Sequence, residues 1–100
     1  MDKYPTSQMK ELFKTVLTLK TPEEAEKFFR DLCTIAELTE FANRWQMVKL
    51  LVKGESYAEI ARKLKVSTTT VTRVAHWLNH GMGGYKLAVN RLNSAFKNNS

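Results

Sequence analysis

The sequence predicts an all-α fold, and three observations lead to that expectation. Apolar residues recur at the i, i+3, i+4 and i+7 spacing of amphipathic helices along most of the 100 residues. No segment alternates apolar and polar residues as a half-buried strand does. Three Ser/Thr-x-x-Glu capping boxes mark helix starts, at 21–24, 34–37 and 56–59. With 43% hydrophobic and 26% charged residues, we treat 1–100 as a single soluble globular domain.

The first half of the chain predicts three helices. The first ends near Lys20, and its apolar stripe comprises Met9, Leu12, Phe13, Val16 and Leu17. The second begins at Thr21, which can cap the helix, with Pro22 in the first helical position. Its inward side chains are expected to be Ala25, Phe28, Phe29 and Leu32. The third runs from the capping box of Thr34 to Gly54. Its apolar stripe comprises Leu38, Phe41, Ala42, Trp45, Val48 and Val52.

The second half predicts two short helices, a glycine-rich break and a final helix. A short helix follows Ser56 and ends at about Leu64, and after a turn another helix spans 67–79. The segment Gly81-Met82-Gly83-Gly84 then interrupts the helical pattern. The final helix, within 84–97, carries on its apolar side Tyr85, Ala88, Val89, Leu92, Ala95 and Phe96.

The segment 56–78 has the apolar spacing of a helix-turn-helix motif. Its apolar positions are Ile60, Ala61, Leu64, Val66, Val71 and Val74. The small side chain of Ala61 lets two short helices cross closely, and Val66 would fill the turn. Lys65 stands where such turns often have glycine, and a left-handed lysine would cost about 1 kcal/mol. The motif therefore predicts a DNA-binding head.

The charge distribution supports that prediction. The formal net charge is +6, and residues 53–100 hold eight Lys and Arg against only two acids, whereas acids and bases balance over 1–52. A basic half of this kind is suited to meeting a polyanion such as double-stranded DNA.

A helix-turn-helix places the N-terminal residues of its second helix at base edges in the major groove. The residues in that position are Ser67, Thr68, Thr69, Thr70, Thr72 and Arg73. Three further cations lie before or in the turn, where phosphates usually pass, namely Arg62, Lys63 and Lys65. Ser67 is also explained as a helix cap, and Arg73 as a phosphate contact. The threonine run is harder to explain by folding alone, because threonine is a mediocre helix former.

Over about residues 8–97 the sequence resembles the bacterial tryptophan-repressor family, with the motif-bearing part at 34–78. The stretch RVAHWLNHGMGGYKLA is most similar to the shorter tryptophan-repressor-related branch of that family. The resemblance implies six helices that interlock with a second subunit in an intertwined homodimer. Residues 1–54 would then form the core and dimerisation helices, 56–78 the DNA-binding head and 84–97 a C-terminal packing helix. It further implies a repressor that binds palindromic half-sites through the helix at 67–79.

The resemblance also implies a small-molecule effector pocket. The family's ligand-contacting arginines match Arg44 and Arg73, and a family threonine matches Thr34. Two positions depart from the family pattern: Val74 replaces a glycine that leaves space for the indole ring, and Trp77 replaces a serine. Valine would intrude on the ligand volume, and the indole of Trp77 could itself occupy the pocket. These departures argue against L-tryptophan as corepressor, although it stays a candidate effector. A surface ion pair explains Arg44 equally well, and capping explains Thr34.

Other chemistries find little support in the sequence. His76 and His80 could share a helix face, but no third metal ligand accompanies them, so we expect no metal site. The single cysteine, Cys33, lacks a histidine partner, and we expect no enzymatic activity. No apolar stretch is long enough to cross a membrane, and neither a signal peptide nor a disulfide framework is evident, which together favour the cytoplasm.

Two alternatives to a sequence-specific regulator stay open at this point. In the first, the helical hairpin is a protein-interaction module, whose binding would depend little on salt. In the second, the chain binds nucleic acid without regard to sequence. Binding through several phosphates would weaken steeply with salt, which separates the first alternative from both DNA-binding ones.

Overall fold

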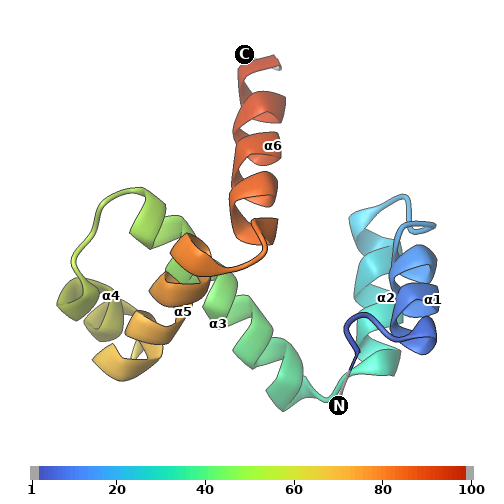
Figure 1. Ribbon diagram of the computed structural model, residues 1–100, viewed down its shortest axis with the longest axis horizontal. Coiled ribbons are helices and arrows are strands. Elements are labelled where there is room, and N and C mark those ends of the chain that lie inside the picture. Colours follow the sequence, from blue (N-terminus) through green and yellow to red (C-terminus); the bar gives the residue numbers. More distant parts are fainter. Residues whose placement is uncertain (1–2, 99–100) are drawn as a thin grey trace. The chain divides into compact units, whose positions relative to one another are not determined.

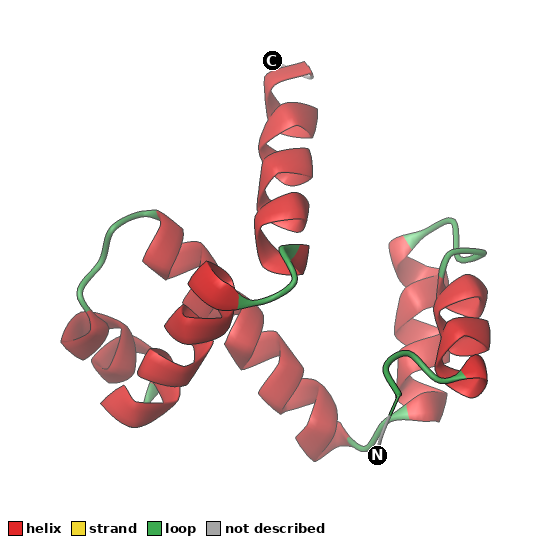
Figure 2. Ribbon diagram, in the orientation of Figure 1, coloured by secondary structure: helices red, strands yellow, loops and turns green. Residues whose placement is uncertain are grey.

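Six helices make up the computed structural model, which describes residues 3–98 (Figure 1). They are α1 (Ser7–Val16), α2 (Pro22–Leu32), α3 (Ile35–Val52), α4 (Tyr57–Leu64), α5 (Thr68–His80) and α6 (Gly84–Asn98). No strand occurs over 3–98 (Figure 2), and the all-α prediction is confirmed. Within that range no helix is both long and apolar enough to cross a membrane.

The helix starts follow the predicted caps. Thr21, Thr34 and Ser56 each accept a hydrogen bond through their hydroxyl oxygen from the backbone N–H three residues later, at 3.1 Å in every case. At Thr34 the box is reciprocal, because its own N–H donates to Glu37 Oε1 at 2.9 Å. At Ser56 the carboxylate of Glu59 binds an arginine instead, and this difference matters for the site.

The chain divides into two compact units, residues 1–38 and 39–100. In the first unit, α2 turns Ala25, Phe28 and Phe29 partly inward, and the two phenyl rings meet edge to face with centroids 5.5 Å apart. Leu32 is 48% exposed, so its expected inward position is wrong for this chain alone. It is the last residue of α2, and a helical hairpin offers no third layer to cover it.

The second unit contains the fully buried core. Its largest fully buried side chains are Met47, Val48, Ile60 and Val71. Together with Ala61 and Val74 they join α3, α4 and α5 in one cluster, which confirms the predicted anchors of the helix-turn-helix. On the α3 stripe, however, Phe41 and Val52 are 46% and 50% exposed. The stripe is apolar along its whole length, but the α4–α5 head covers α3 only around Met47 and Val48.

The connections between helices are as local rules predict. Lys65 adopts the left-handed conformation, with φ 57° and ψ 46°, and Val66 N donates to Ala61 O at 3.0 Å to close α4. Gly54, with φ 90°, follows the end of α3. Gly81 follows α5, where an added Cβ would lie 2.4 Å from the carbonyl oxygen of Trp77. α5 begins one residue later than expected because Ser67 is its N-cap. The last two apolar positions of the final helix, Ala95 and Phe96, lie outside the residues whose side chains are described.

Candidate nucleic-acid interface

The start of α5 presents a row of hydroxyl groups that the structure sorts into two sets. Ser67 Oγ accepts the N–H of Thr70 at 3.2 Å and lies 3.0 Å from Thr70 Oγ1. Thr72 Oγ1 donates to the carbonyl oxygen of Thr68 at 2.9 Å. In contrast, the side chains of Thr68 and Thr69 are exposed, and neither hydroxyl has a partner within residues 3–98. Two of the threonines expected at base edges thus have free hydroxyls.

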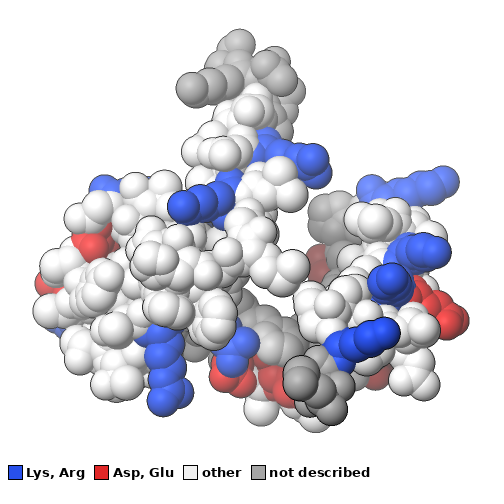
Figure 3. All heavy atoms as spheres, viewed as in Figure 1, with Lys and Arg blue, Asp and Glu red and all other residues white. Residues whose placement is uncertain are grey.

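The predicted phosphate-contacting cations also fall into two sets. Arg62 donates to both carboxylate oxygens of Glu59, with Nη2–Oε1 at 2.5 Å and Nε–Oε2 at 3.3 Å. Lys63 forms an ion pair with Glu55 of the preceding loop. Lys65 and Arg73 are exposed, and within the described part of the chain neither has an acidic partner. Blue cationic side chains outnumber red acidic ones over α4–α6 on the face shown in Figure 3.

The Arg62–Glu59 pair shifts the titration of both groups. The hydrogen bonds and the positive charge of Arg62 lower the pKa of the Glu59 carboxyl below its ordinary value of 4.5. The same contacts with Glu59 raise the pKa of the Arg62 guanidinium. Because the folded-state pKa of the carboxyl is depressed, the pair is intact at neutral pH and is lost only as the pH falls through that lowered value.

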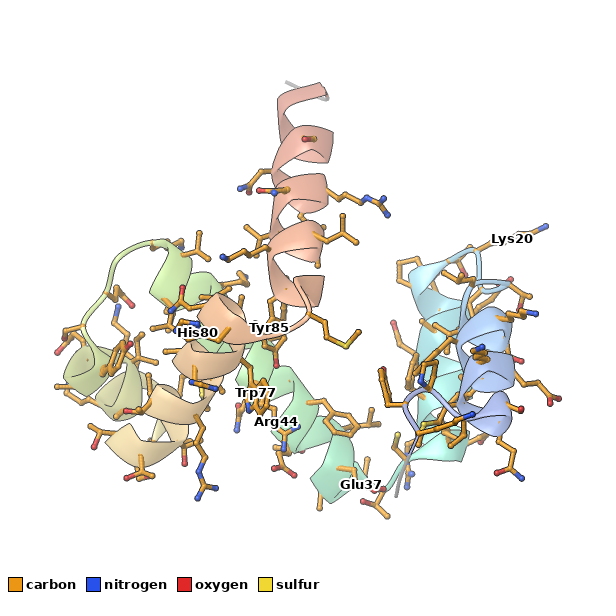
Figure 4. All side chains as sticks on the ribbon, viewed as in Figure 1. Lys20, Glu37, Arg44, Trp77, His80 and Tyr85 are labelled. Atoms are coloured by element: carbon orange, nitrogen blue, oxygen red, sulfur yellow. The ribbon has the colours of Figure 1, made fainter. Side chains whose placement is uncertain are left out.

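A cavity of about 380 Å³ lies beside α5 in the second unit. Its lining residues come from α3, α5 and α6 and comprise Glu40, Arg44, Thr70, Arg73, Val74, Trp77 and Tyr85. Figure 4 shows Arg44 of α3 next to Trp77 of α5, with Tyr85 of α6 close by. Trp77 is 61% exposed, so in this chain it borders the cavity and leaves its volume open.

The cavity unites four of the five residues expected in an effector pocket: Arg44, Arg73, Val74 and Trp77. The fifth, Thr34, belongs to the first unit and caps α3. Arg44 also forms the expected surface ion pair, with Nη2 at 2.7 Å from Glu40 Oε1. Glu40 and Tyr85 also line the cavity, and neither was expected there. Glu40 lies one helical turn before Arg44, and this spacing was the signal in the sequence that could have predicted the Glu40–Arg44 ion pair.

Neither histidine chemistry nor the cysteine adds a further site. The rings of His76 and His80 lie 5.2 Å apart, and among the residues described no three His, Cys, Asp or Glu side chains are grouped to hold a metal ion. Cys33 has a free, partly buried thiol.

Comparison with known proteins decides the family. Residues 7–93 match the family model described as Trp repressor protein. The chain belongs to this family. Its members are regulatory rather than enzymatic proteins, and the resemblance to this family noted in the sequence is confirmed.

Relatives of the Trp repressor family support the assignment in sequence and in structure. The chain is 37% identical to the uncharacterized protein YerC of Bacillus subtilis (strain 168), over 92% of this chain and 88% of YerC. The crystal structure of a TrpR-like protein from Eubacterium eligens superposes with a TM-score of 0.84 and 38% identity, covering 89% of this chain and 92% of that one. A second crystal structure, from Staphylococcus aureus, has a TM-score of 0.82 and 36% identity over 88% of each chain. The six-helix Trp-repressor-like fold is therefore confirmed.

Proposed function

We propose that this chain is a sequence-specific DNA-binding transcriptional regulator, a repressor that works in the cytoplasm on palindromic sites. The arrangement of α5 carries the proposal: Thr68 and Thr69 hold free hydroxyls at the start of a helix that α4 and α3 fix in place. Hydroxyl groups and threonine methyls can read base edges in the major groove. The unpaired cations Lys65 and Arg73 flank them and are suited to phosphates.

Exposed apolar surface supports a homodimer. Phe41 and Val52 of α3 and Leu87 and Leu92 of α6 are each about half exposed in the single chain, at 46–51%. A groove of about 310 Å³ between these helices is lined in part by Val52 and Leu92. Surface of this kind on a small soluble protein marks an association site. A second copy that covers it would place two recognition helices on one duplex, with half-sites about one helical turn apart.

The dimer can be tested at the groove. Leu92→Asp would bury a carboxylate in the interface, and we expect it to convert the dimer to a monomer. Sedimentation velocity measures the change, with Met82→Asp at an 88% exposed position as the control for an added charge. A wild-type chain that sediments as a monomer would contradict the proposed dimer.

The cavity suits a small ligand that carries an anionic group. Arg44 and Arg73 both line it, and guanidinium groups bind carboxylates and phosphates through paired hydrogen bonds. Val74 also lines the cavity, at the position where the resemblance to the Trp repressor family implies a glycine that leaves space for an indole ring. We therefore do not expect L-tryptophan to be the effector. Because Arg73 and Thr70 belong to both α5 and the cavity wall, a ligand there would bias the position of the recognition helix.

Arg73 gives a direct prediction for DNA binding. Arg73→Gln removes an unpaired cation, and we expect the slope of log K against log salt to fall by about 1, with affinity weakened similarly for all sequences. Fluorescence anisotropy over a salt series measures the slope. Lys27→Gln, which removes an exposed cation from α2, should leave the slope unchanged. An unaltered slope for Arg73→Gln would remove this residue from the interface.

The function as a whole is tested by selecting genomic DNA fragments with the purified protein at about 0.15 M salt. Two selections are run in parallel. One contains no added ligand, and the other contains L-tryptophan. Enrichment of a palindromic site without ligand supports the proposal, whereas enrichment only with L-tryptophan supports the regulator and contradicts our view of the cavity. The proposed function would be contradicted if the chain had no affinity for any duplex. Binding to another protein with an affinity that changes little with salt would then favour an interaction module.

A further inference from the structure

The second half of the chain has only two acids, Glu55 and Glu59, and both pair with cations of the predicted DNA-binding head. Arg62 presents its Nε and Nη2 to the two oxygens of Glu59 one turn earlier on α4. This paired face of a guanidinium is also one that binds a phosphate through two parallel hydrogen bonds. Arg62 cannot offer that face to Glu59 and to a DNA phosphate at the same time.

The carboxylate of Glu59 is committed to this pair. In a capping box it would accept the N–H of the cap residue, as Glu37 does at Thr34. Glu59 uses both oxygens for Arg62 instead, while its own backbone N–H donates to Ser56. The side chains of Arg62 and Glu59 are 68% and 48% exposed, so an incoming phosphate can reach the guanidinium.

We propose that Glu59 competes with DNA phosphate for Arg62: it holds the guanidinium in the free protein and releases it when the head binds a duplex. The inference rests on the proposed function. Glu59 is thereby a positioning residue that limits the affinity of the head for DNA in general. With this general affinity lowered, contacts of α5 with bases contribute a larger share of the free energy of binding to a specific site.

The neighbouring pair behaves differently. Glu55 Oε2 is buried without a hydrogen-bond partner, and the side chain of Glu55 is only 26% exposed. If Lys63 left for a phosphate, this carboxylate would stay poorly hydrated and unpaired, which is costly. We therefore expect Lys63 to keep its contact with Glu55, tying α4 to the loop that precedes it, and Arg62 to be the exchangeable cation.

A double-mutant cycle tests the competition with the full chain and a labelled duplex of random sequence. The proteins are wild type, Glu59→Gln, Arg62→Gln and the double variant, measured by fluorescence anisotropy over a salt series. Glutamine suits the third helical position and preserves the Ser56 cap, so each variant should fold, as circular dichroism will show. Glu59→Gln should bind about 3- to 10-fold more tightly at low salt, with a smaller gain as salt screens the pair.

The second background isolates the role of Arg62. With Arg62→Gln in place, the gain from Glu59→Gln should shrink to less than about twofold, because no guanidinium is left to release. Glu26→Gln, an exposed carboxylate of α2 with no ion pair within residues 3–98, controls for net charge and should change affinity less than about twofold.

The outcomes separate the inference from the proposed function. A gain limited to the background with Arg62 supports the competition. If Glu59→Gln raises the DNA affinity equally in both backgrounds, or in neither, the competition is overturned. The regulator proposal then still stands as long as the wild-type chain binds the duplex. A wild-type chain without affinity for any duplex contradicts the proposed function and the competition with it.

Discussion

Replacing Ile60 by alanine is expected to lower the free energy of unfolding of the helix-turn-helix unit by about 3 kcal/mol. Ile60 is fully buried, and it belongs to the cluster through which α4 contacts α3 and α5. Truncation leaves a cavity between three helices that the short connections of the head keep from collapsing. Urea unfolding of the full chain, followed by circular dichroism, measures the loss through the transition midpoint.

The matched control for Ile60→Ala is Met82→Ala, a truncation of similar size at a position that is 88% exposed. It should change the unfolding free energy by less than about 0.5 kcal/mol. If both variants lost the same stability, the head would not be organised around the core cluster seen here. The consequence for function is direct, because the position of α5 depends on that cluster.

Local sequence rules predicted the turn and most helix boundaries, although α1 ends at Val16, before the expected end near Lys20. The caps at Thr21, Thr34 and Ser56 each use one hydroxyl and one N–H three residues away, so they need no knowledge of the rest of the chain. The left-handed Lys65 followed equally from the spacing of the motif. The core anchors Ile60 and Val71 were predictable because two short helices in a tight turn have one mutual face.

Burial along the longer stripes could not be predicted in this way. Periodicity shows which face of a helix is apolar, but it does not show which part of that face another element covers. Phe41, Val52 and Leu32 were expected inside and are 46–50% exposed. Each would need a further layer of protein, and for Phe41 and Val52 we propose that a second copy of the chain supplies it.

Counting charges likewise could not identify which cations are free. The sequence placed Arg62 and Lys63 together with Lys65 and Arg73 as one basic set. The structure pairs the first two with the only acids of that half, because Glu59 lies one turn before Arg62 and Glu55 lies in the adjoining loop. The same holds for the hydroxyl groups at the start of α5. Some form hydrogen bonds with the backbone as caps or donors, and others stay free.

The free hydroxyls of Thr68 and Thr69 lead to the second prediction with a large effect, which concerns specific DNA binding. Replacing Thr68 and Thr69 together by alanine is expected to weaken binding to the selected operator by about 10- to 100-fold, as the loss of two hydrogen bonds to bases would. Binding to random duplex should change by less than about twofold, since phosphate contacts carry that affinity. Competition anisotropy with both duplexes measures the ratio.

Thr72→Ala is the matched control, because it removes the same groups from the same helix at an exposed position. Its hydroxyl already donates to the carbonyl oxygen of Thr68, so its loss should cost less specific affinity than either free hydroxyl. Alanine is the better helix former, so neither variant should weaken binding through unfolding of α5. A double variant that kept the full preference for the operator would mean that Thr68 and Thr69 do not read bases. Discrimination would then come from other residues of α5 or from the shape of the DNA, and the head would dock with a different part of α5 in the groove.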